Sequence, residues 1–130
     1  MFKPVEQKIN RIAPNGKYVR TENHFPIANR DKAGVWELFT LVHLNNNDEC
    51  AILSYDKFFL CSDLYNNNHI TANRDEVGAW EIVKIIKLEN NEVAFKAANG
   101  KYWSLDEKTN LIFATGETIG KNEKFKIVQN

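Results

Sequence analysis

The chain has 130 residues, of which 43% are hydrophobic and 26% charged, and its 17 Lys and Arg residues balance 17 Asp and Glu residues. This length suits one domain, expected over residues 1–130, with enough apolar residues to bury a core. A net charge of zero argues against a nucleic-acid partner, and no apolar run approaches the ~20 residues that span a bilayer. Because residues 1–4 also lack the apolar start of a signal peptide, we expect a monomeric cytoplasmic protein without membrane insertion.

The first strong local signal is the pair Asn15-Gly16, which lies between β-prone residues. Asn-Gly favours a two-residue hairpin turn, because both turn positions need a positive φ. The pair returns at Asn99-Gly100, and Tyr55-Asp56 takes the corresponding place between them. Short Asn tracts are a second turn signal, because Asn tolerates left-handed backbone, and we expect them at loop tips. These tracts are 45–47, 66–68 and 90–91.

A ten-residue segment occurs twice in the chain, at 28–37 and at 72–81. The Ala, Asn, Arg, Asp, Gly, Trp and Glu residues of the first copy return at the same places in the second, without a gap. In the third unit, we interpret the strand that starts at Phe125 as the counterpart of the strands that start at Trp36 and Trp80. The chain therefore divides into three repeats, approximately 8–48, 49–91 and 92–130.

Each repeat reads as four short strands. A hairpin of two strands is followed by a polar loop, a short apolar strand and a final, more apolar strand that begins with Trp or Phe. The short apolar strands are predicted at 26–28, 70–72 and 111–113. No window sustains the i, i+3, i+4 spacing of a helix. Three units of four strands predict an all-β chain of twelve strands closed with pseudo-threefold symmetry, which is the β-trefoil, a six-stranded barrel capped by three hairpins.

The recurring aromatic residues are expected to fill the core of this barrel in threefold-related layers. They are Tyr18, Phe58 and Tyr102, and Trp36, Trp80 and Phe125. Phe59 and Trp103 each follow one of these residues by one position, so we expect their side chains to face away from the core and to be partly exposed.

Two cysteines, Cys50 and Cys61, lack the C-x-x-C spacing of zinc and redox sites. If the second hairpin turns at Tyr55-Asp56, these cysteines lie opposite one another on paired strands, close to the distance of a disulfide. In a reducing cytoplasm we expect free thiols that are neighbours.

The Gly-Lys-Tyr sequences at 16–18 and 100–102, followed by Ala-Asn-Arg-Asp and Trp-Glu, resemble the fascin-like β-trefoil domain of the actin-crosslinking-like superfamily. Its repeat commonly reads as a Gly-Lys-Tyr strand, an acidic loop, an Ala-Asn-Arg strand end and a Trp-Glu strand. Members include actin-bundling fascins, histidine-rich hisactophilins and carbohydrate-binding appendages of glycosidases. The resemblance covers 12–128 and implies the fold, together with binding to actin or to a glycan.

The chain departs from the known binding motifs of these and other trefoils. Gly34 and Gly78 lie two residues before Trp36 and Trp80, where ricin-type lectins have the Gln of Gln-x-Trp. Three histidines are too few for the pH dependence of hisactophilins, and one trefoil is too few to bridge filaments as the tandem fascin domains do. Filament bundling by a monomer is therefore not expected.

Catalytic motifs are missing from the sequence. It contains no G-x-S-x-G, no H-E-x-x-H and no phosphate-binding glycine loop. The three histidines, His24, His43 and His69, fall in separate segments without metal-ligand spacing. We expect a protein that is not an enzyme and has neither a cofactor nor a metal site.

The candidate binding residues come from two sets of loops. Behind each hairpin strand, an acid near an aromatic ring is the minimal sugar site, since carboxylates accept from hydroxyl groups and rings stack on the sugar. The Asn-Arg pairs either bind a ligand or, as we favour, form a duplicated scaffold in which Arg30 pairs with Asp31 or Glu37 and Asn caps a turn. The candidates are Glu22, Asn23, Asn29, Arg30, Asp63, Tyr65, Asn73, Arg74, Trp103 and Asp106.

The leading hypothesis is a lectin-like, carbohydrate-binding module that acts through the loops of the first two repeats. The alternatives are a protein that binds actin filaments and a protein–protein interaction module. An acidic filament needs a basic patch. The lysines available for one, at 84, 87, 121, 124 and 126, are interleaved with Glu, so the glycan is favoured.

Overall fold

The structure is a computed structural model that describes residues 5–45, 48–63 and 65–129. In these residues there are twelve strands and three short 3₁₀-helices. The strands are β1 (Val5–Ile12), β2 (Tyr18–Glu22), β3 (Phe25–Arg30), β4 (Phe39–His43), β5 (Glu49–Leu53), β6 (Phe59–Asp63), β7 (His69–Arg74), β8 (Val83–Lys87), β9 (Glu92–Lys96), β10 (Tyr102–Leu105), β11 (Ile112–Gly116) and β12 (Phe125–Gln129). The 3₁₀-helices are η1 (Val35–Glu37), η2 (Ala79–Glu81) and η3 (Lys121–Glu123).

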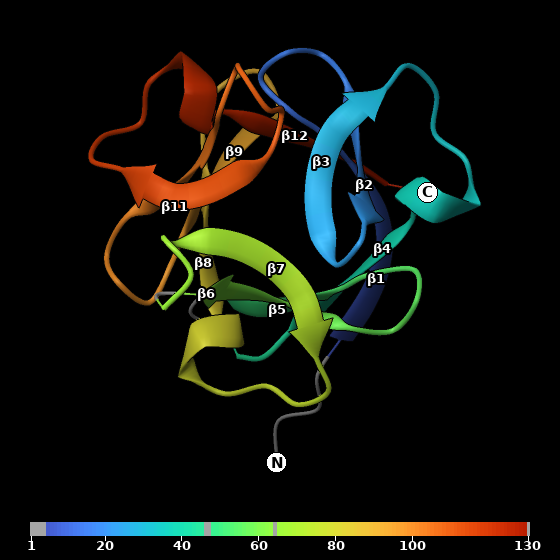
Figure 1. The fold of residues 1–130 in the computed structure, drawn as a ribbon, viewed down its shortest axis with the longest axis vertical. Coiled ribbons are helices and arrows are strands. Elements are labelled where there is room, and N and C mark those ends of the chain that lie inside the picture. The colour runs from blue at the N-terminus through green and yellow to red at the C-terminus, as the bar shows by residue number, and fades with distance from the viewer. Residues whose placement is uncertain (1–4, 46–47, 64, 130) are drawn as a thin grey trace.

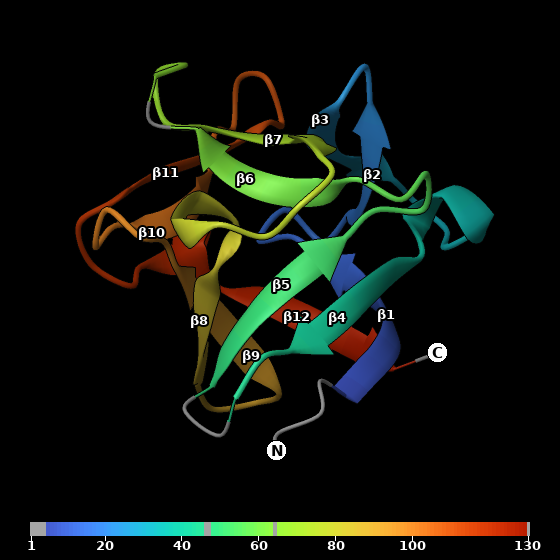
Figure 2. The ribbon, with the colours of Figure 1, turned by 90° about the horizontal axis from the view of Figure 1, so that it is seen from below.

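Six strands form a closed antiparallel barrel in the order β1, β4, β5, β8, β9, β12 (Figure 2). The ring closes where β12 returns to β1, with Ile127 opposite Arg11. Closure leaves no open edge among the barrel strands, as three repeats that cannot bury their own apolar faces require. The predicted all-β trefoil with twelve strands is confirmed.

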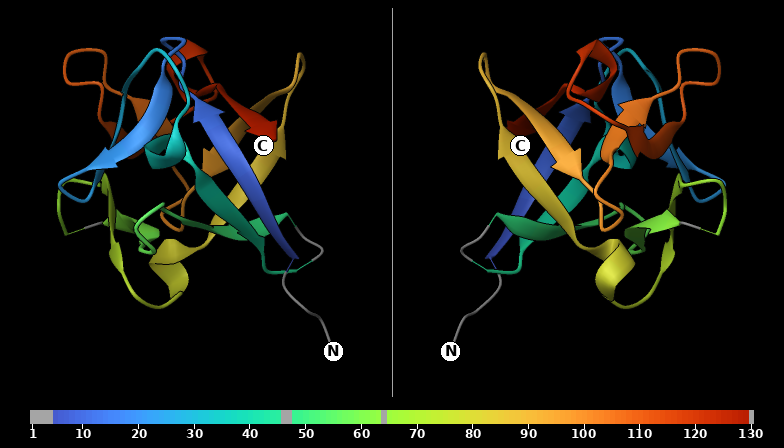
Figure 3. Two further views of the ribbon diagram at one scale, coloured as in Figure 1. Left: turned by 90° about the vertical axis from the view of Figure 1, so that its right-hand side faces the viewer. Right: turned by 90° about the vertical axis from the view of Figure 1, so that its left-hand side faces the viewer.

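Three hairpins, β2–β3, β6–β7 and β10–β11, cap one end of the barrel, and β3, β7 and β11 face the viewer in Figure 1. Figure 3 shows them on one side of the barrel, with the β8–β9 turn on the other. The carbonyl at each hairpin tip accepts a hydrogen bond from an alanine N–H of another repeat. These bonds join Ala72 to His24 (2.7 Å), Ala114 to Asn68 (2.7 Å) and Ala28 to Asn110 (2.9 Å). The cap is therefore a ring in which every repeat holds another.

The asparagine tracts lie at turns, as predicted. Asn67, Asn68, Asn90 and Asn91 have positive φ angles, between 52° and 62°. Residues 46 and 47 of the first tract are outside the described residues. The tip residues His24 and Asn110 are left-handed as well, with φ of 67° and 63°, so the ring of carbonyls in the cap depends on this backbone conformation.

The turns that enter β2, β6 and β10 have three residues rather than the predicted two. Only their last residue is left-handed, at Gly16 (φ 80°), Lys57 (φ 74°) and Gly100 (φ 80°). In the second turn the Ser54 N–H donates to the Phe58 carbonyl at 2.8 Å, so the turn is 55–57. The added residue moves the register by one position, and Phe59, not Phe58, is the counterpart of Tyr18 and Tyr102. All of these aromatic residues are half-buried, so the prediction that Tyr18, Phe58 and Tyr102 fill the core is wrong.

The shifted register also separates the two cysteines. Leu53 opposite Phe59 is the pair that joins β5 to β6. Cys50 lies opposite Val83 and His43 instead, and Cys61 lies opposite Thr71. The prediction that they oppose one another is therefore wrong. Both thiols are free and fully buried, and burial raises the pKa of each to about 12.

The two repeated tryptophans are outside the core, contrary to prediction. They lie in η1 and η2, and the third helix aligns Asn122, not Phe125, with Trp36 and Trp80. Each helix is preceded by a glycine whose N–H donates to the glutamate carboxylate three residues later. The bonds are Gly34 to Glu37 (2.6 Å), Gly78 to Glu81 (2.6 Å) and Gly120 to Glu123 (2.7 Å). After this turn the next strand begins with Phe39, Val83 or Phe125, and these side chains fill the core.

The core contains one tryptophan and one arginine. Trp103 was expected to be partly exposed, but it is only 1% exposed and its Nε1–H donates to Ser62 Oγ at 3.0 Å. Arg11 is fully buried, with its guanidinium 4.6 Å from the Phe39 ring centre and 5.5 Å from that of Trp103. None of its three nitrogens has a hydrogen-bond partner, and burial lowers its pKa to about 9. In the barrel ladders Arg11 corresponds to Ile52 and Phe95, so a cation occupies an apolar position.

Candidate functional site

Each repeat forms an outer flank between its cap hairpin, its 3₁₀-helix and the turn that starts the next repeat. In the first repeat this flank is a depression of about 340 Å³. We name it the first flank, and its lining residues are Arg20, Thr21, Glu22, Asn23, Trp36 and Asp56. The side chains come from β2, from the β2–β3 turn, from η1 and from the β5–β6 turn.

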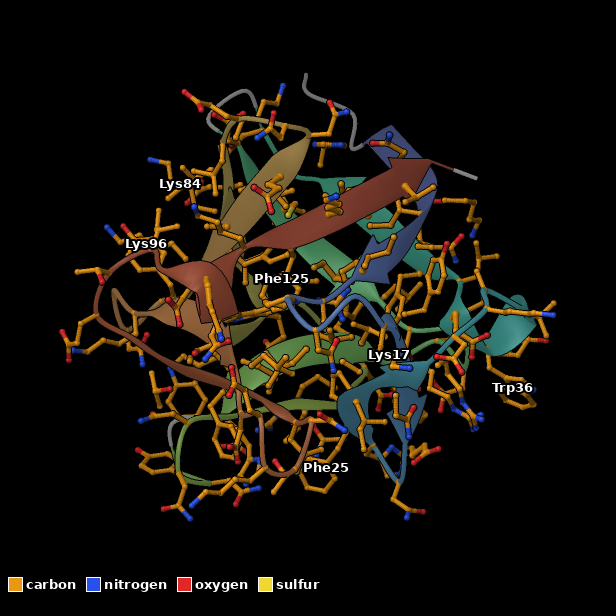
Figure 4. The ribbon with its side chains drawn as sticks, turned by 90° about the horizontal axis from the view of Figure 1, so that it is seen from above. Lys17, Phe25, Trp36, Lys84, Lys96 and Phe125 are labelled. Carbon is orange, nitrogen blue, oxygen red and sulfur yellow. The ribbon has the colours of Figure 1, made fainter. Side chains whose placement is uncertain are left out.

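Trp36 is the apolar surface of the first flank. Since Phe39 turns inward after η1, Trp36 points outward and is 54% exposed; Figure 4 shows it at the outer edge of the molecule and Phe125 inside the barrel. The Tyr55 ring contacts it edge to face, with centres 5.0 Å apart, and the Arg20 guanidinium lies 6.0 Å from its centre. These contacts hold the ring in place and leave surface on which a flat apolar ligand face can stack.

The polar groups beside Trp36 are two carboxylates and a guanidinium. Glu22 Oε1 lies 3.6 Å from Arg20 Nε and 3.4 Å from Arg30 Nη2. Asp56 is held by the Ser54 hydroxyl. Asn23 is exposed in the left-handed β2–β3 turn. Carboxylates that accept, and a guanidinium and an amide that donate, can satisfy a ligand rich in hydroxyl groups.

The arginines of the Asn-Arg elements form ion pairs within their own hairpins, with partners other than those predicted. Arg30 pairs with Glu22 of the neighbouring strand, and Arg74 pairs with Asp63 at 3.6 Å. Asp31 instead accepts from Lys17, which holds the pKa of Asp31 below its usual range. Glu37, the other predicted partner of Arg30, accepts from the backbone of its own 3₁₀-turn.

The two asparagines of these elements are bulge residues. The register shifts of the hairpins leave Asn29 unpaired between Ala28 and Arg30, and Asn73 between Ala72 and Arg74. Both side chains are exposed. The Asn73 side-chain oxygen accepts from the hydroxyl of Thr71, which belongs to the same strand β7, at 3.2 Å. Neither asparagine lines the first flank.

The corresponding surface of the second repeat, the second flank, also carries an aromatic pair. Tyr65 is 91% exposed, and its ring contacts the half-buried Trp80 with centres 5.1 Å apart. Asp63 Oδ1 accepts from the Tyr65 N–H at 3.2 Å, while its other oxygen faces Arg74. Residue 64 of this loop is outside the described residues. The predicted candidates Asp63, Tyr65 and Arg74 are therefore brought together.

The third flank lacks an exposed ring. Asn122 stands where the other repeats have tryptophan, and Lys121 pairs with Glu107 at 3.3 Å. Asp106 accepts from the Lys108 N–H and from the Thr109 hydroxyl, so it stabilises its own turn. Since Trp103 is buried, Asp106 and Trp103 do not form the predicted acid–aromatic site.

Sequence reasoning missed Arg20, Trp36, Tyr55, Asp56 and Trp80 as surface residues of these flanks. A signal was present in the repeat itself. The glycine and glutamate of the 3₁₀-turn return in all three copies, whereas the tryptophan becomes Asn122 in the third. Within this turn the glycine and the glutamate that bond to one another are constant, and the position that varies is the one whose side chain takes no part in that bond.

A cavity of about 730 Å³ lies at the end of the barrel opposite the cap. It is lined by aliphatic side chains, such as the buried Leu41 and Ile85 and the half-buried Ile127, and Lys87 and Lys126 contribute to its rim. Acidic residues share this rim, so it has no single charge. Within the described residues, no three or more His, Cys, Asp or Glu side chains gather as a metal site would need. None of the helices described here is long and apolar enough to cross a membrane.

Comparisons with known proteins bear on the fold. No family model and no curated protein sequence matches the chain. Among solved structures, the designed threefold-symmetric protein ThreeFoil is similar, with a TM-score of 0.82 and 14% identity over 95% of this chain and 99% of that one. The BEL β-trefoil has a TM-score of 0.77 and 14% identity, over 95% of this chain and 93% of that chain.

A mosquitocidal holotoxin is also similar, with a TM-score of 0.81 and 15% identity, over 96% of this chain and 16% of the toxin. Such low identities establish architecture and carry no ligand or activity across. The fascin-like subclass is not confirmed by these likenesses. Both the strand order and the comparisons lead to one conclusion: the chain is a β-trefoil domain.

Proposed function

We propose that the chain is a non-catalytic, monomeric carbohydrate-binding module of the cytoplasm and that it binds its ligand at the first flank. The observation that supports this most is the exposed Trp36 ring beside Glu22, Arg20 and Asp56 in one depression. A sugar ring has one face of C–H groups and a rim of hydroxyl groups. Trp36 matches the face, and the two carboxylates and the guanidinium match the rim.

The electrostatics of the first flank support a neutral ligand. Glu22 is already near two arginines, and Asp56 is the second acid of the depression. The Arg20 side chain is mostly buried and its Nε lies 3.6 Å from Glu22 Oε1, so the guanidinium and the carboxylate already compensate one another's charge. Replacing water at such partly satisfied groups by well-placed hydroxyls costs little.

Binding to actin filaments is the second candidate. Its supporting observation is the direct opposition of Lys84 and Lys96 on β8 and β9, also visible in Figure 4. Like charges placed opposite one another are unfavourable in the free protein and favour an acidic partner. Glu49 lies opposite Lys84 on its other side, and Glu92 opposite Lys126, so acids interrupt this surface. We therefore rank actin below the glycan.

A glycan array tests the proposal, with Trp36→Ala and Asn122→Ala as matched variants of the same 3₁₀ position. We expect the wild-type protein and Asn122→Ala to bind the same glycans, and Trp36→Ala to bind about five- to thirteenfold more weakly, because a stacked ring contributes about 1–1.5 kcal/mol. An array without signal, together with salt-sensitive co-sedimentation with F-actin, would instead establish the second candidate. Binding that Trp36→Ala leaves unchanged would exclude the first flank.

A further inference from the structure

The second flank has the same parts as the first but was built from different side chains. Trp80 follows Gly78 in the same 3₁₀-turn that places Trp36 after Gly34. From this correspondence we infer that the second flank is a second carbohydrate site, so that one chain binds at two places and cross-links multivalent glycans. This inference rests on the proposed function of the first flank.

The polar groups correspond pair by pair. Asp63 ends β6 where Glu22 ends β2, and each faces the arginine of its own hairpin: Arg74 at 3.6 Å and Arg30 at 3.4 Å. Glu22 keeps Oε2 outside its ion pair, whereas Asp63, which is 14% exposed, keeps Oδ1, which also accepts from the Tyr65 N–H. An acceptor beside an exposed ring is therefore present in both repeats, which is the minimum that stacking and hydroxyl recognition need.

The tyrosine of each aromatic pair comes from a different part of the trefoil. Tyr55, which contacts Trp36, belongs to the turn of the following repeat, whereas Tyr65, which contacts Trp80, belongs to the hairpin of the same repeat. The sequence repeat does not include either tyrosine. Two different solutions that pair a tyrosine with the tryptophan of this turn argue for a function of the aromatic pair, since scaffolding alone would not need the tyrosine rings to be exposed, Tyr55 by 41% and Tyr65 by 91%.

One difference predicts that the second site is weaker. The position that Arg20 occupies in β2 is occupied in β6 by Cys61, which is buried. The second flank therefore has no guanidinium at this position beside Trp80. The second flank thereby lacks a donor that the first flank has. Loss of a charged donor to a ligand costs about tenfold in affinity or more.

The two sites serve separate ligands because of the pseudo-threefold arrangement. In Figure 1, η1 lies on the right of the molecule and η2 at its lower left, so the flanks face different directions. A sugar ring that stacks on Trp36 therefore does not stack on Trp80 as well. Two sites that face apart bind different chains of a multivalent ligand, and this raises the apparent affinity for a densely coated surface by ~10² or more.

Precipitation and stoichiometry test the inference. The probes are albumin conjugates densely substituted with galactose, mannose, glucose or N-acetylglucosamine, mixed with wild-type protein, Trp36→Ala, Trp80→Ala and Asn122→Ala. We expect wild type and Asn122→Ala to precipitate one of these conjugates. Each tryptophan variant is expected to bind this conjugate without precipitation and with a lower apparent affinity. Calorimetry with the free sugar should give two sites per chain for wild type and Asn122→Ala, and one site per chain for Trp36→Ala and Trp80→Ala.

Each contrary outcome has a distinct meaning. Binding of wild type to a conjugate with a single site, or unchanged precipitation by Trp80→Ala, would overturn the second site and leave the proposed function intact. Precipitation by both single variants would trace cross-linking to association between chains and would also overturn the inference. Failure of wild type to bind any conjugate or any array glycan would overturn the proposed function and the inference with it. Because Trp36 is exposed and Trp80 half-buried, circular dichroism and the unfolding midpoint should show that each variant is folded.

Discussion

The first and third flanks have the same scaffold and different surfaces. In both, a glycine N–H donates to a glutamate three residues later, at 2.6 Å and 2.7 Å, and the chain then turns into the core at Phe39 or Phe125. The exposed position of the turn is Trp36 in one and Asn122 in the other. The difference shows that the 3₁₀-turn depends on the glycine and the glutamate that the repeats share, whereas the side chain between them can change from Trp36 to Asn122.

The largest test of this comparison uses two tryptophans in one chain. Trp103→Ala should lower the free energy of unfolding by about 3–5 kcal/mol, because a buried ring and its bond to Ser62 are lost. Trp36→Ala should lower it by less than about 1 kcal/mol, because the ring is already half in water. Urea unfolding followed by circular dichroism measures both, and similar losses would contradict the assignment of Trp36 to the surface.

A gain in stability is expected at the buried cation. Arg11→Met keeps a long apolar stem between the rings of Phe39 and Trp103 and removes an unpartnered charge, so we expect stabilisation by about 1–4 kcal/mol. Arg20→Met, at a partly exposed site, serves as the control and should change the unfolding free energy little. A destabilised Arg11→Met would mean that the guanidinium is hydrogen-bonded in solution.

The buried thiols should make stability depend on pH in the alkaline range. The folded pKa of Cys50 is raised to about 12 from a value of 9.0, so its stabilising effect is complete below pH 9 and is lost as the pH rises toward 12. In that window the wild-type protein should lose about 1.4 kcal/mol more per pH unit than Cys50→Ala. Arg11 acts with the opposite sign and is present in both proteins, and Cys50 raises the pKa of Arg11 by less than burial lowers it, so the thiol dominates the difference between the two curves. Parallel curves for the two proteins would contradict the burial of this thiol.

The smallest expected effect separates the scaffold from surface ion pairs. Glu37→Ala leaves the Gly34 N–H without its acceptor and should cost about 1–2 kcal/mol of unfolding free energy. Glu117→Ala removes an exposed partner of Lys101 and should cost less than about 0.5 kcal/mol. Thermal melts of the two variants provide the comparison, and equal midpoints would show that the 3₁₀-turn does not depend on its glutamate.

The contact between the glutamate carboxylate and the backbone also favours glycine as the residue before each 3₁₀-helix. A Cβ atom built on Gly34 would lie 3.2 Å from Glu37 Oε1, and on Gly78 3.1 Å from Glu81 Oε1. Both backbones are extended, so φ does not demand glycine here. The close approach of the carboxylate explains why Gly-x-x-Glu returns in every repeat, and why it is part of the fold and not of a sugar motif.

The repeats and the turn residues were sufficient to predict the architecture. Three units with the same apolar segments require a closed structure, and asparagine and glycine mark its turns because they adopt left-handed backbone. The acids and rings of the hairpin loops were also identifiable, and Glu22, Asp63 and Tyr65 do lie at the first and second flanks. Local chemistry was enough for these statements.

Tertiary structure decided which aromatic residues lie inside. In a strand, side chains alternate between two faces, so one extra turn residue before β6 exchanges inside and outside along that strand. A single 3₁₀-turn likewise moves the core position from Trp36 to Phe39, three residues later. The repeat pattern determines which positions are equivalent, but only the register and the packing of neighbouring strands determine where their side chains point. For that reason the sequence alone predicted the trefoil correctly, whereas Trp36, expected in the core, is exposed and Trp103, expected to be partly exposed, is buried.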